Sequence, residues 1–176
     1  IRLLAVSMDK TDEMIPLRQE LDTLQAYLRI QRMRYGERFA LSTLVPEELM
    51  DLYVPKLILQ PLVENAVFHG FADGRADGLI VVEGRLSGSM LLLSVADNGV
   101  GMAPELARSV LDGSAPEVRQ HHKGSFRSIG LRNTQDRIRL RFGDAYGLDV
   151  VSQEGVGTMI TVSLPQATQA GAAGDG

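Results

Sequence analysis

The sequence predicts an α+β fold, a two-layer sandwich whose mixed, mostly antiparallel sheet carries helices on one face. Apolar runs at 79–86 and 90–96 flank a Ser-Gly-Ser turn, which is typical of a hairpin. Runs at 147–153 and 157–164 flank a Glu-Gly turn, and the second alternates apolar and polar side chains, as a strand with one buried face does. Helical patterns elsewhere in the chain supply the second layer.

Residues 16–35 read as one helix, with Pro16 at its start and Gly36 as its stop. It precedes the sandwich in the chain. Its apolar stripe is narrow and has a 4-3-4-3 spacing: Leu17, Leu21, Leu24, Leu28 and Gln31. Such a stripe fits both a helix-pairing seam and a helix lying on the core, and the pattern leaves both readings open.

The remaining elements follow from local pattern. Residues 38–45 resemble a strand, and 131–142 have helical periodicity. The apolar segment 55–70 is also helical, but Pro61 removes a backbone donor, so we expect a kink or a helix that starts near Gln60. Within the glycine-rich stretch 97–130, Pro104 marks a short helix. A long irregular stretch in a compact domain is usually functional.

Composition limits the function classes. The chain has 176 residues, 44% of them hydrophobic, with a net charge of −4 and no cysteine. Both signs of charge are interspersed, so a basic footprint for nucleic acid or an anionic membrane is absent. No apolar run approaches the roughly 20 residues of a membrane span. Because residue 1 is Ile, we expect an excised piece whose missing part holds any membrane anchor.

The first polar cluster is Glu64-Asn65 with His69-Gly70, in an otherwise apolar helix. Asn65 and His69 are four residues apart and share one helix face. An amide oxygen beside a carboxylate suits Mg²⁺, which keeps water and substrate phosphates as its other ligands. The alternative is a polar helix edge satisfied by backbone groups.

The second cluster, Asp97-Asn98-Gly99-Val100-Gly101, directly follows an apolar strand. An aspartate there can accept from an exocyclic amine such as that of adenine, while the glycines let backbone approach a flat ring. Met102-Ala-Pro follows and favours a functional loop over a simple Asn-Gly turn.

Two further clusters complete the series. Gly130-Leu131-Arg132-Asn133 places a glycine before a predicted helix, where free N–H groups suit an anion, and Lys123 and Arg127 add positive charge. Thr158, after a Gly-Val-Gly turn, can hydrogen-bond a base or a bridging water. A solvated basic loop and a tight hairpin are the alternatives. The order of the four clusters is restrictive, and the chain lacks the P-loop and dinucleotide fingerprints.

The sequence resembles the GHKL superfamily, which includes gyrase, Hsp90, MutL and histidine kinases. "PKLILQPLVENAVFHG" closely resembles the asparagine box of LytS-type sensor histidine kinases. "DNGVGM", "SIGLRNTQDRIRLRFG" and "EGVGTMITVSLP" resemble that family's glycine boxes and closing strand. "IPLRQELDTLQAYLRIQRMRYGERF" is similar to the helix between its histidine motif and ATPase domain.

The resemblance implies a Bergerat fold that binds ATP with Mg²⁺, and it implies a role for each matching residue. Asn65 and Glu64 would hold the metal and serve catalysis, and Asp97 would accept from the adenine amine. The implied ATP-binding residues are Asn65, His69, Asp97, Gly99, Gly101, Met102, Lys123, Arg127, Gly130, Leu131, Asn133 and Thr158. Residues 103–128 would form the ATP lid.

The resemblance also implies the organisation of the protein. Residues 1–36 would end a dimerisation and linker region, 37–165 would bind ATP, and 166–176 would be a disordered tail. The γ-phosphate would pass to a histidine on a helix of the homodimer and then to a response regulator. We expect a cytoplasmic domain of a membrane sensor protein, with no nucleic-acid partner.

Three departures from the family pattern stand out. Phe68 replaces a common lysine, Arg-Ser-Ile precedes Gly130 in place of a glycine-rich run, and no Asn-Pro-His-Phe motif occurs. The phosphoacceptor histidine therefore lies outside this sequence. The alternative is a pseudokinase or nucleotide-sensing module that transfers nothing. A clamp ATPase is disfavoured because Pro61 occupies the position of its catalytic glutamate, and the 16–35 helix fits an anti-sigma serine kinase less well.

Overall fold

The computed structural model describes residues 13–36, 38–71, 77–112 and 127–169. Its main sheet has five strands in the order β2-β4-β5-β7-β6. The strands are β2 (Phe39–Leu44), β4 (Gly78–Ser87), β5 (Met90–Asp97), β6 (Gly147–Gln153) and β7 (Gly157–Pro165). β2 pairs with β4 in parallel and the other pairs are antiparallel, which confirms the predicted mixed sheet.

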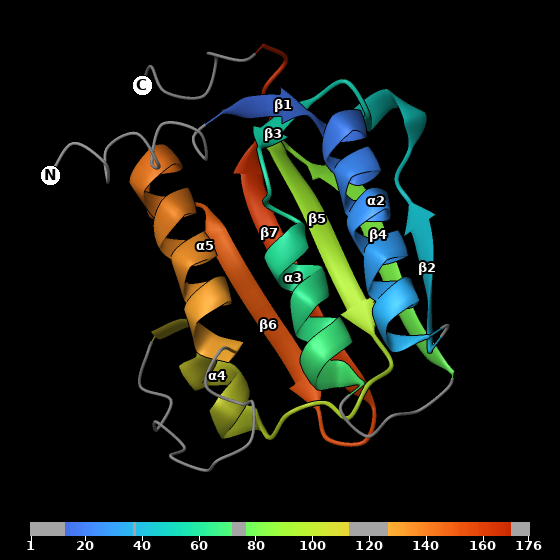
Figure 1. Ribbon diagram of the computed structural model, residues 1–176. Helices are drawn as coiled ribbons and strands as arrows, with labels where there is room; N and C mark the ends of the chain where they lie inside the picture. Colours follow the sequence, from blue (N-terminus) through green and yellow to red (C-terminus); the bar gives the residue numbers. More distant parts are fainter. Residues whose placement is uncertain (1–12, 37, 72–76, 113–126, 170–176) are drawn as a thin grey trace, which may run out of the picture.

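Helices cover one face of this sheet. α2 (Leu17–Tyr35), α3 (Gln60–Asn65) and α5 (Arg127–Phe142) lie side by side on it, and α4 (Pro104–Asp112) packs against α5 and β6 (Figure 1). The two-layer arrangement confirms the predicted fold class. None of the helices in the described ranges is long and apolar enough to cross a membrane.

The core lies between the layers because the central strands β5 and β7 alternate buried and more exposed side chains. Leu91, Leu93 and Val95 of β5 are 0–2% exposed, and the intervening side chains face the other side of the sheet. β7 repeats the pattern through Ile160, Val162 and Leu164. A one-residue slip would turn these side chains to solvent, so the hydrophobic pattern fixes the register.

The narrow stripe of α2 is buried in this same core. Leu17, Leu21, Leu24 and Leu28 are 0–5% exposed and belong to the hydrophobic cluster that includes the strands. α2 therefore packs on the sheet as an amphipathic helix, with its leucine stripe facing the core.

α3 begins at Gln60, as Pro61 predicts, since proline is tolerated in the first turn. After Asn65 the helix widens into a π-helical turn, η2 (Ala66–Gly70), in which the Phe71 N–H donates to the Ala66 carbonyl. π turns often occur at functional sites. The turn begins directly after Asn65 and ends at Gly70.

Several features differ from the sequence prediction. α5 begins at Arg127, four residues before the predicted 131, so Gly130 lies inside its first turn. A small antiparallel sheet of β1 (Met14–Pro16) and β3 (Tyr53–Pro55), and the turn η1 (Glu47–Leu49), were not predicted. These elements have three residues each, too few for a periodic signal.

The first residues of the predicted disordered tail are ordered. The Ala167 carbonyl accepts the Tyr53 N–H at 2.8 Å, and the Gln166 N–H donates to the Ser89 carbonyl at 2.9 Å. Ala167 is buried, and its hydrogen bond to Tyr53 places it beside β3. Residues 170–176 lie outside the described part.

Candidate functional site

Two of the predicted clusters meet at one end of the sheet. Asp97 ends β5, and Thr158 lies directly opposite it near the start of β7. The N–H of Val100, in the loop after β5, donates to the Gly70 carbonyl at 2.8 Å. The loop of the second cluster is therefore fastened to the π turn that follows Asn65.

Glycines are required where these backbones meet. A Cβ on Gly99 would overlap the Gly70 carbonyl, and one on Gly157 would overlap the Asp97 carbonyl. Gly101 has a φ of +67°, which disfavours other residues. Gly99 and Gly101 are predicted ATP-binding residues, and in the structure they allow close backbone packing.

The side chain of Asp97 is oriented by its own loop. Its Oδ1 accepts the Gly99 N–H at 2.8 Å, two residues ahead. The neighbouring Asn98 anchors the loop to β4, since its Oδ1 accepts the Leu79 N–H at 2.7 Å. Hydrogen bonding of this kind fixes an acceptor before any ligand arrives.

Ser152 is a site residue that the sequence analysis missed. Its Oγ accepts the Met102 N–H at 2.8 Å, donates to the Gly157 carbonyl at 3.0 Å, and lies 2.8 Å from the Thr158 Oγ1. Thr158 itself is buried. Because the single Ser152 proton goes to Gly157, the Thr158 hydroxyl donates to Ser152 and keeps acceptor lone pairs. A serine in an alternating strand carries no distinguishing signal.

Asn65 is the last residue of α3 and is nearly buried, at 7% exposure. The π turn follows it directly and carries the Gly70 carbonyl to which the loop after β5 is bonded. Glu64 beside it is held at Oε1 by the Gln60 Nε2, 2.9 Å away. His69 is partly exposed on the following turn, and Phe68 is 42% exposed.

The third cluster is only partly described. Leu131 is buried in the core and Asn133 is exposed on α5. Gly130 lies in the first turn of α5, where its carbonyl accepts the Thr134 hydroxyl at 2.9 Å. Arg127 begins this helix, its side chain is not described, and Lys123 lies outside the described residues with most of the predicted lid.

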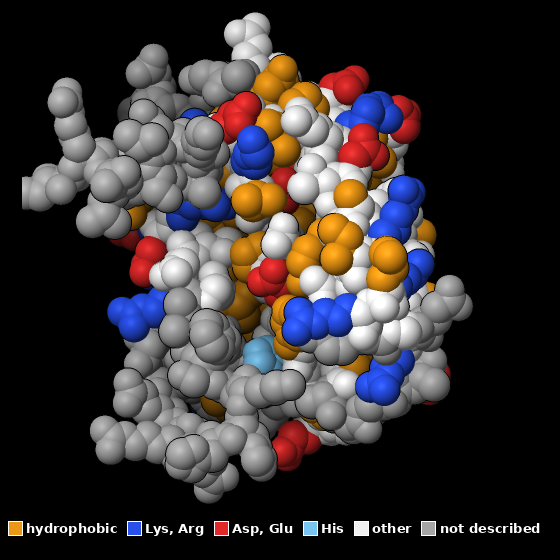
Figure 2. All heavy atoms as spheres, viewed as in Figure 1, with side chains coloured by type: hydrophobic (Ala, Val, Ile, Leu, Met, Phe, Trp, Pro, Cys, Tyr) orange, Lys and Arg blue, Asp and Glu red, His pale blue; other side chains and the backbone are white. Residues whose placement is uncertain are grey.

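The face that bears the helices carries both kinds of charge. Figure 2 shows acidic and basic side chains dispersed among hydrophobic ones over its described part. Within the described ranges no three His, Cys, Asp or Glu side chains group as a metal cage. A Mg²⁺ that arrives with a nucleotide needs no such cage, because phosphates and water supply most of its ligands.

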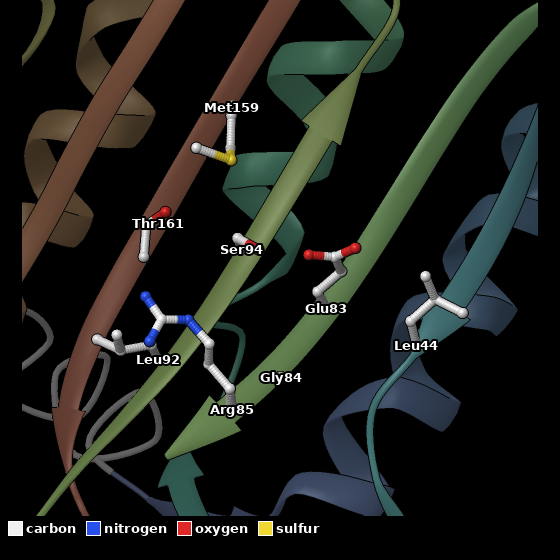
Figure 3. Close-up of a pocket in the computed structure, with 8 residues that line it drawn as sticks. All are labelled: Leu44, Glu83, Gly84, Arg85, Leu92, Ser94, Met159 and Thr161. Carbon is white, nitrogen blue, oxygen red and sulfur yellow. The ribbon is translucent and has the colours of Figure 1, made fainter. Parts of the chain in front are cut away.

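A hollow on the other face of the sheet lies apart from these residues. Figure 3 shows its lining side chains on β4, β5 and β7 with Leu44 at the end of β2, and the helices lie behind the sheet. They are Leu44, Glu83, Gly84, Arg85, Leu92, Ser94, Met159 and Thr161. None is a predicted site residue.

Comparison with known families identifies this architecture. The family model described as "Histidine kinase-, DNA gyrase B-, and HSP90-like ATPase" matches residues 51–168, and one described as "Histidine kinase" matches residues 1–39. The first match covers most of the chain. The chain therefore belongs to the histidine kinase-, gyrase B- and HSP90-like ATPase family.

Sensor histidine kinases are among its relatives. The chain is 30% identical over 163 residues to sensor histidine kinase YesM of Bacillus subtilis, covering 93% of this chain and 26% of the relative. It is 29% identical over 155 residues to sensor protein LytS of Oceanobacillus iheyensis, covering 88% and 26%. The chain thus spans about a quarter of these relatives' length.

Solved structures agree on the fold. The catalytic domain of histidine kinase ThkA superposes with a TM-score of 0.66 at 16% identity, covering 88% of this chain and 95% of that one. The histidine kinase domain of an Erythrobacter litoralis blue-light-activated kinase gives 0.56 at 20% identity, covering 89% and 64%. At this identity the likeness concerns the fold alone.

The close packing of Gly99 yields a testable contrast with Gly130. We expect Gly99→Ala to lower the free energy of unfolding by about 2 kcal/mol or more, because its Cβ meets backbone. Gly130→Ala is the matched control, since the nearest atom, the Pro61 Cβ, is 4.0 Å away. In a helical turn this change should stabilise by up to ~1 kcal/mol. Urea denaturation measures both, and equal effects would contradict the packing argument.

Proposed function

We propose that this chain is the ATP-binding catalytic part of a sensor histidine kinase. The observation that carries the proposal is the meeting of Asp97 and Thr158 at one end of the sheet, beside the π turn that follows Asn65. Acceptors on the sheet and an amide on the neighbouring helix suit the two ends of a nucleotide. The family membership and the sensor-kinase relatives support the same reading.

On the base side, Asp97 would accept from the exocyclic amine of adenine. Its carboxylate is held by the Gly99 N–H, so little reorientation is needed on binding. Thr158 would add a hydroxyl acceptor, positioned by Ser152. Guanine carries a carbonyl oxygen in place of that amine. The acceptors of Asp97 and Thr158 would then face another acceptor, so we expect the site to select adenine over guanine.

On the phosphate side, Asn65 would contribute its amide oxygen, and Glu64, oriented by Gln60, would hold the metal or its water. Bound Mg²⁺ would neutralise phosphate charge. For the other predicted residues the proposed contacts with ATP rest on the family resemblance. They are His69, Met102, Lys123, Arg127, Gly130, Leu131 and Asn133. Leu131, being buried, would act by packing α5, the helix that bears Gly130 and Asn133.

The proposed reaction transfers the γ-phosphate of ATP to an imidazole nitrogen of a histidine outside this sequence, with ADP as the leaving group. The phosphate would then pass to an aspartate of a response regulator, in a homodimeric sensor anchored elsewhere in a membrane. In the full-length protein, labelled γ-phosphate should appear on histidine. Tight ATP binding without any labelling would leave a nucleotide-sensing module instead.

The binding residues can be tested in the present chain. We expect Asn65→Ala to abolish Mg-ATP binding, and Asp97→Asn to weaken ATP by about tenfold or more, since a charged acceptor is lost. Asp149→Asn, an exposed change of the same type on β6, should leave affinity unchanged. Calorimetric titration with an ATP analogue measures all three. Wild-type affinity in both site variants would overturn the proposed pocket.

A further inference from the structure

A buried carboxylate on α2 caps the start of α3. Glu20 is 1% exposed, and its Oε2 and Oε1 accept the N–H groups of Leu57 and Leu59 at 2.8 and 2.9 Å. Leu59 is the N-cap residue of α3. Helix starts leave N–H groups unsatisfied, and a carboxylate also favours the positive end of the helix dipole. Here the cap comes from another helix, 37 and 39 residues earlier in the chain.

The capped turn is constrained from two sides. Leu57 has a φ of +59°, a conformation that residues other than glycine rarely adopt. On the side of α5, the Arg137 Nη2 donates to the Lys56 carbonyl at 3.0 Å. Backbone strain persists only where the surroundings enforce it. The direction in which α3 leaves this turn therefore depends on side chains of α2 and α5.

The charge state of Glu20 reflects two opposed effects. Burial raises the pKa of the Glu20 carboxyl, while the N–H groups of Leu59, Leu57 and Ile58 and the charge of Arg137 lower it. A carboxylate in such a place is costly unless its hydrogen bonds are kept. If this position served only to fill the core, an apolar side chain would do so without the free-energy cost of burying a carboxylate.

We infer that Glu20 is a positioning residue for nucleotide binding, because its cap sets the direction of the short helix that carries Asn65. The inference rests on the proposed function. Asn65 lies six residues beyond Leu59, about 9 Å along a helix. A tilt of about 10° at the cap would thus move Asn65 by about 1.5 Å, and displacements near 1 Å are enough to impair a site.

The cap also joins the two segments that the family models match. Glu20 belongs to the region of residues 1–39, and Leu57 and Leu59 belong to 51–168. A movement of α2 would pull on the start of α3 directly. The two hydrogen bonds thus provide a physical route from α2 to the helix that carries the Asn65 amide.

Glu20→Gln tests this inference, because an amide keeps the size but presents an NH₂ group to one of the two N–H donors. We expect nucleotide-analogue affinity to fall about tenfold, the equivalent of one charged hydrogen bond, and the Asn65 side-chain amide signal to shift in NMR spectra. Leu24→Ala is the control: it also weakens α2 but touches no cap. It should leave affinity within about twofold.

Several outcomes would overturn the inference. Wild-type affinity and an unmoved Asn65 signal in Glu20→Gln would do so, and so would an equal loss of affinity in Leu24→Ala. If Glu20→Gln fails to fold, hydrogen exchange of the wild-type chain decides: the Leu57 and Leu59 amides should exchange more slowly with nucleotide bound, by reciprocity. Failure of the wild type to bind nucleotide would instead refute the proposed function. The NMR shift of the Asn65 amide in Glu20→Gln would still test whether Glu20 positions Asn65.

Discussion

The structure depends on the close backbone contact around Asp97. Gly99 packs on the Gly70 carbonyl, Gly157 packs on the Asp97 carbonyl, and the Val100 N–H bonds to Gly70. Side chains at these glycines would hold the loop, the π turn and the β6–β7 hairpin apart. The same contact that closes this end of the sandwich therefore brings an acid at a strand end beside the turn that follows Asn65, which is the arrangement that the proposed nucleotide site needs.

The helix layer has a second constraint, at the opposite end of α3. Glu20 of α2 accepts hydrogen bonds at the start of α3, and Arg137 of α5 donates to the Lys56 carbonyl just before it. A helix of six residues has little stability of its own, so its direction comes from these neighbours. The site is thus placed by tertiary contacts at both ends of one short segment, and α2 is part of that placement as well as part of the core.

Much of this was predictable from local pattern. Strand alternation and turn residues gave the five main strands, and Pro61 predicted where α3 begins, since each signal lies within a few residues. Asp97 is recognisable as a polar group directly after an apolar strand, and Asn65 as one within an otherwise apolar helix. The Glu20 cap could not be predicted, because its partners Leu57 and Leu59 are distant in sequence. The Ser152 network could not be predicted either, because a serine in a strand is not an unusual residue. The early start of α5 was missed because Gly130 suggested a boundary that a first helical turn tolerates.

The most direct test of the central claim is calorimetric titration of this chain with a non-hydrolysable ATP analogue, with and without Mg²⁺, against the GTP analogue. We expect adenine-selective binding that Mg²⁺ strengthens, since Asp97 would bind the base and Asn65 the metal-bound phosphates. Equal binding of both nucleotides, or binding indifferent to Mg²⁺, would contradict those roles. No binding at all would leave the fold established and the proposed site without support.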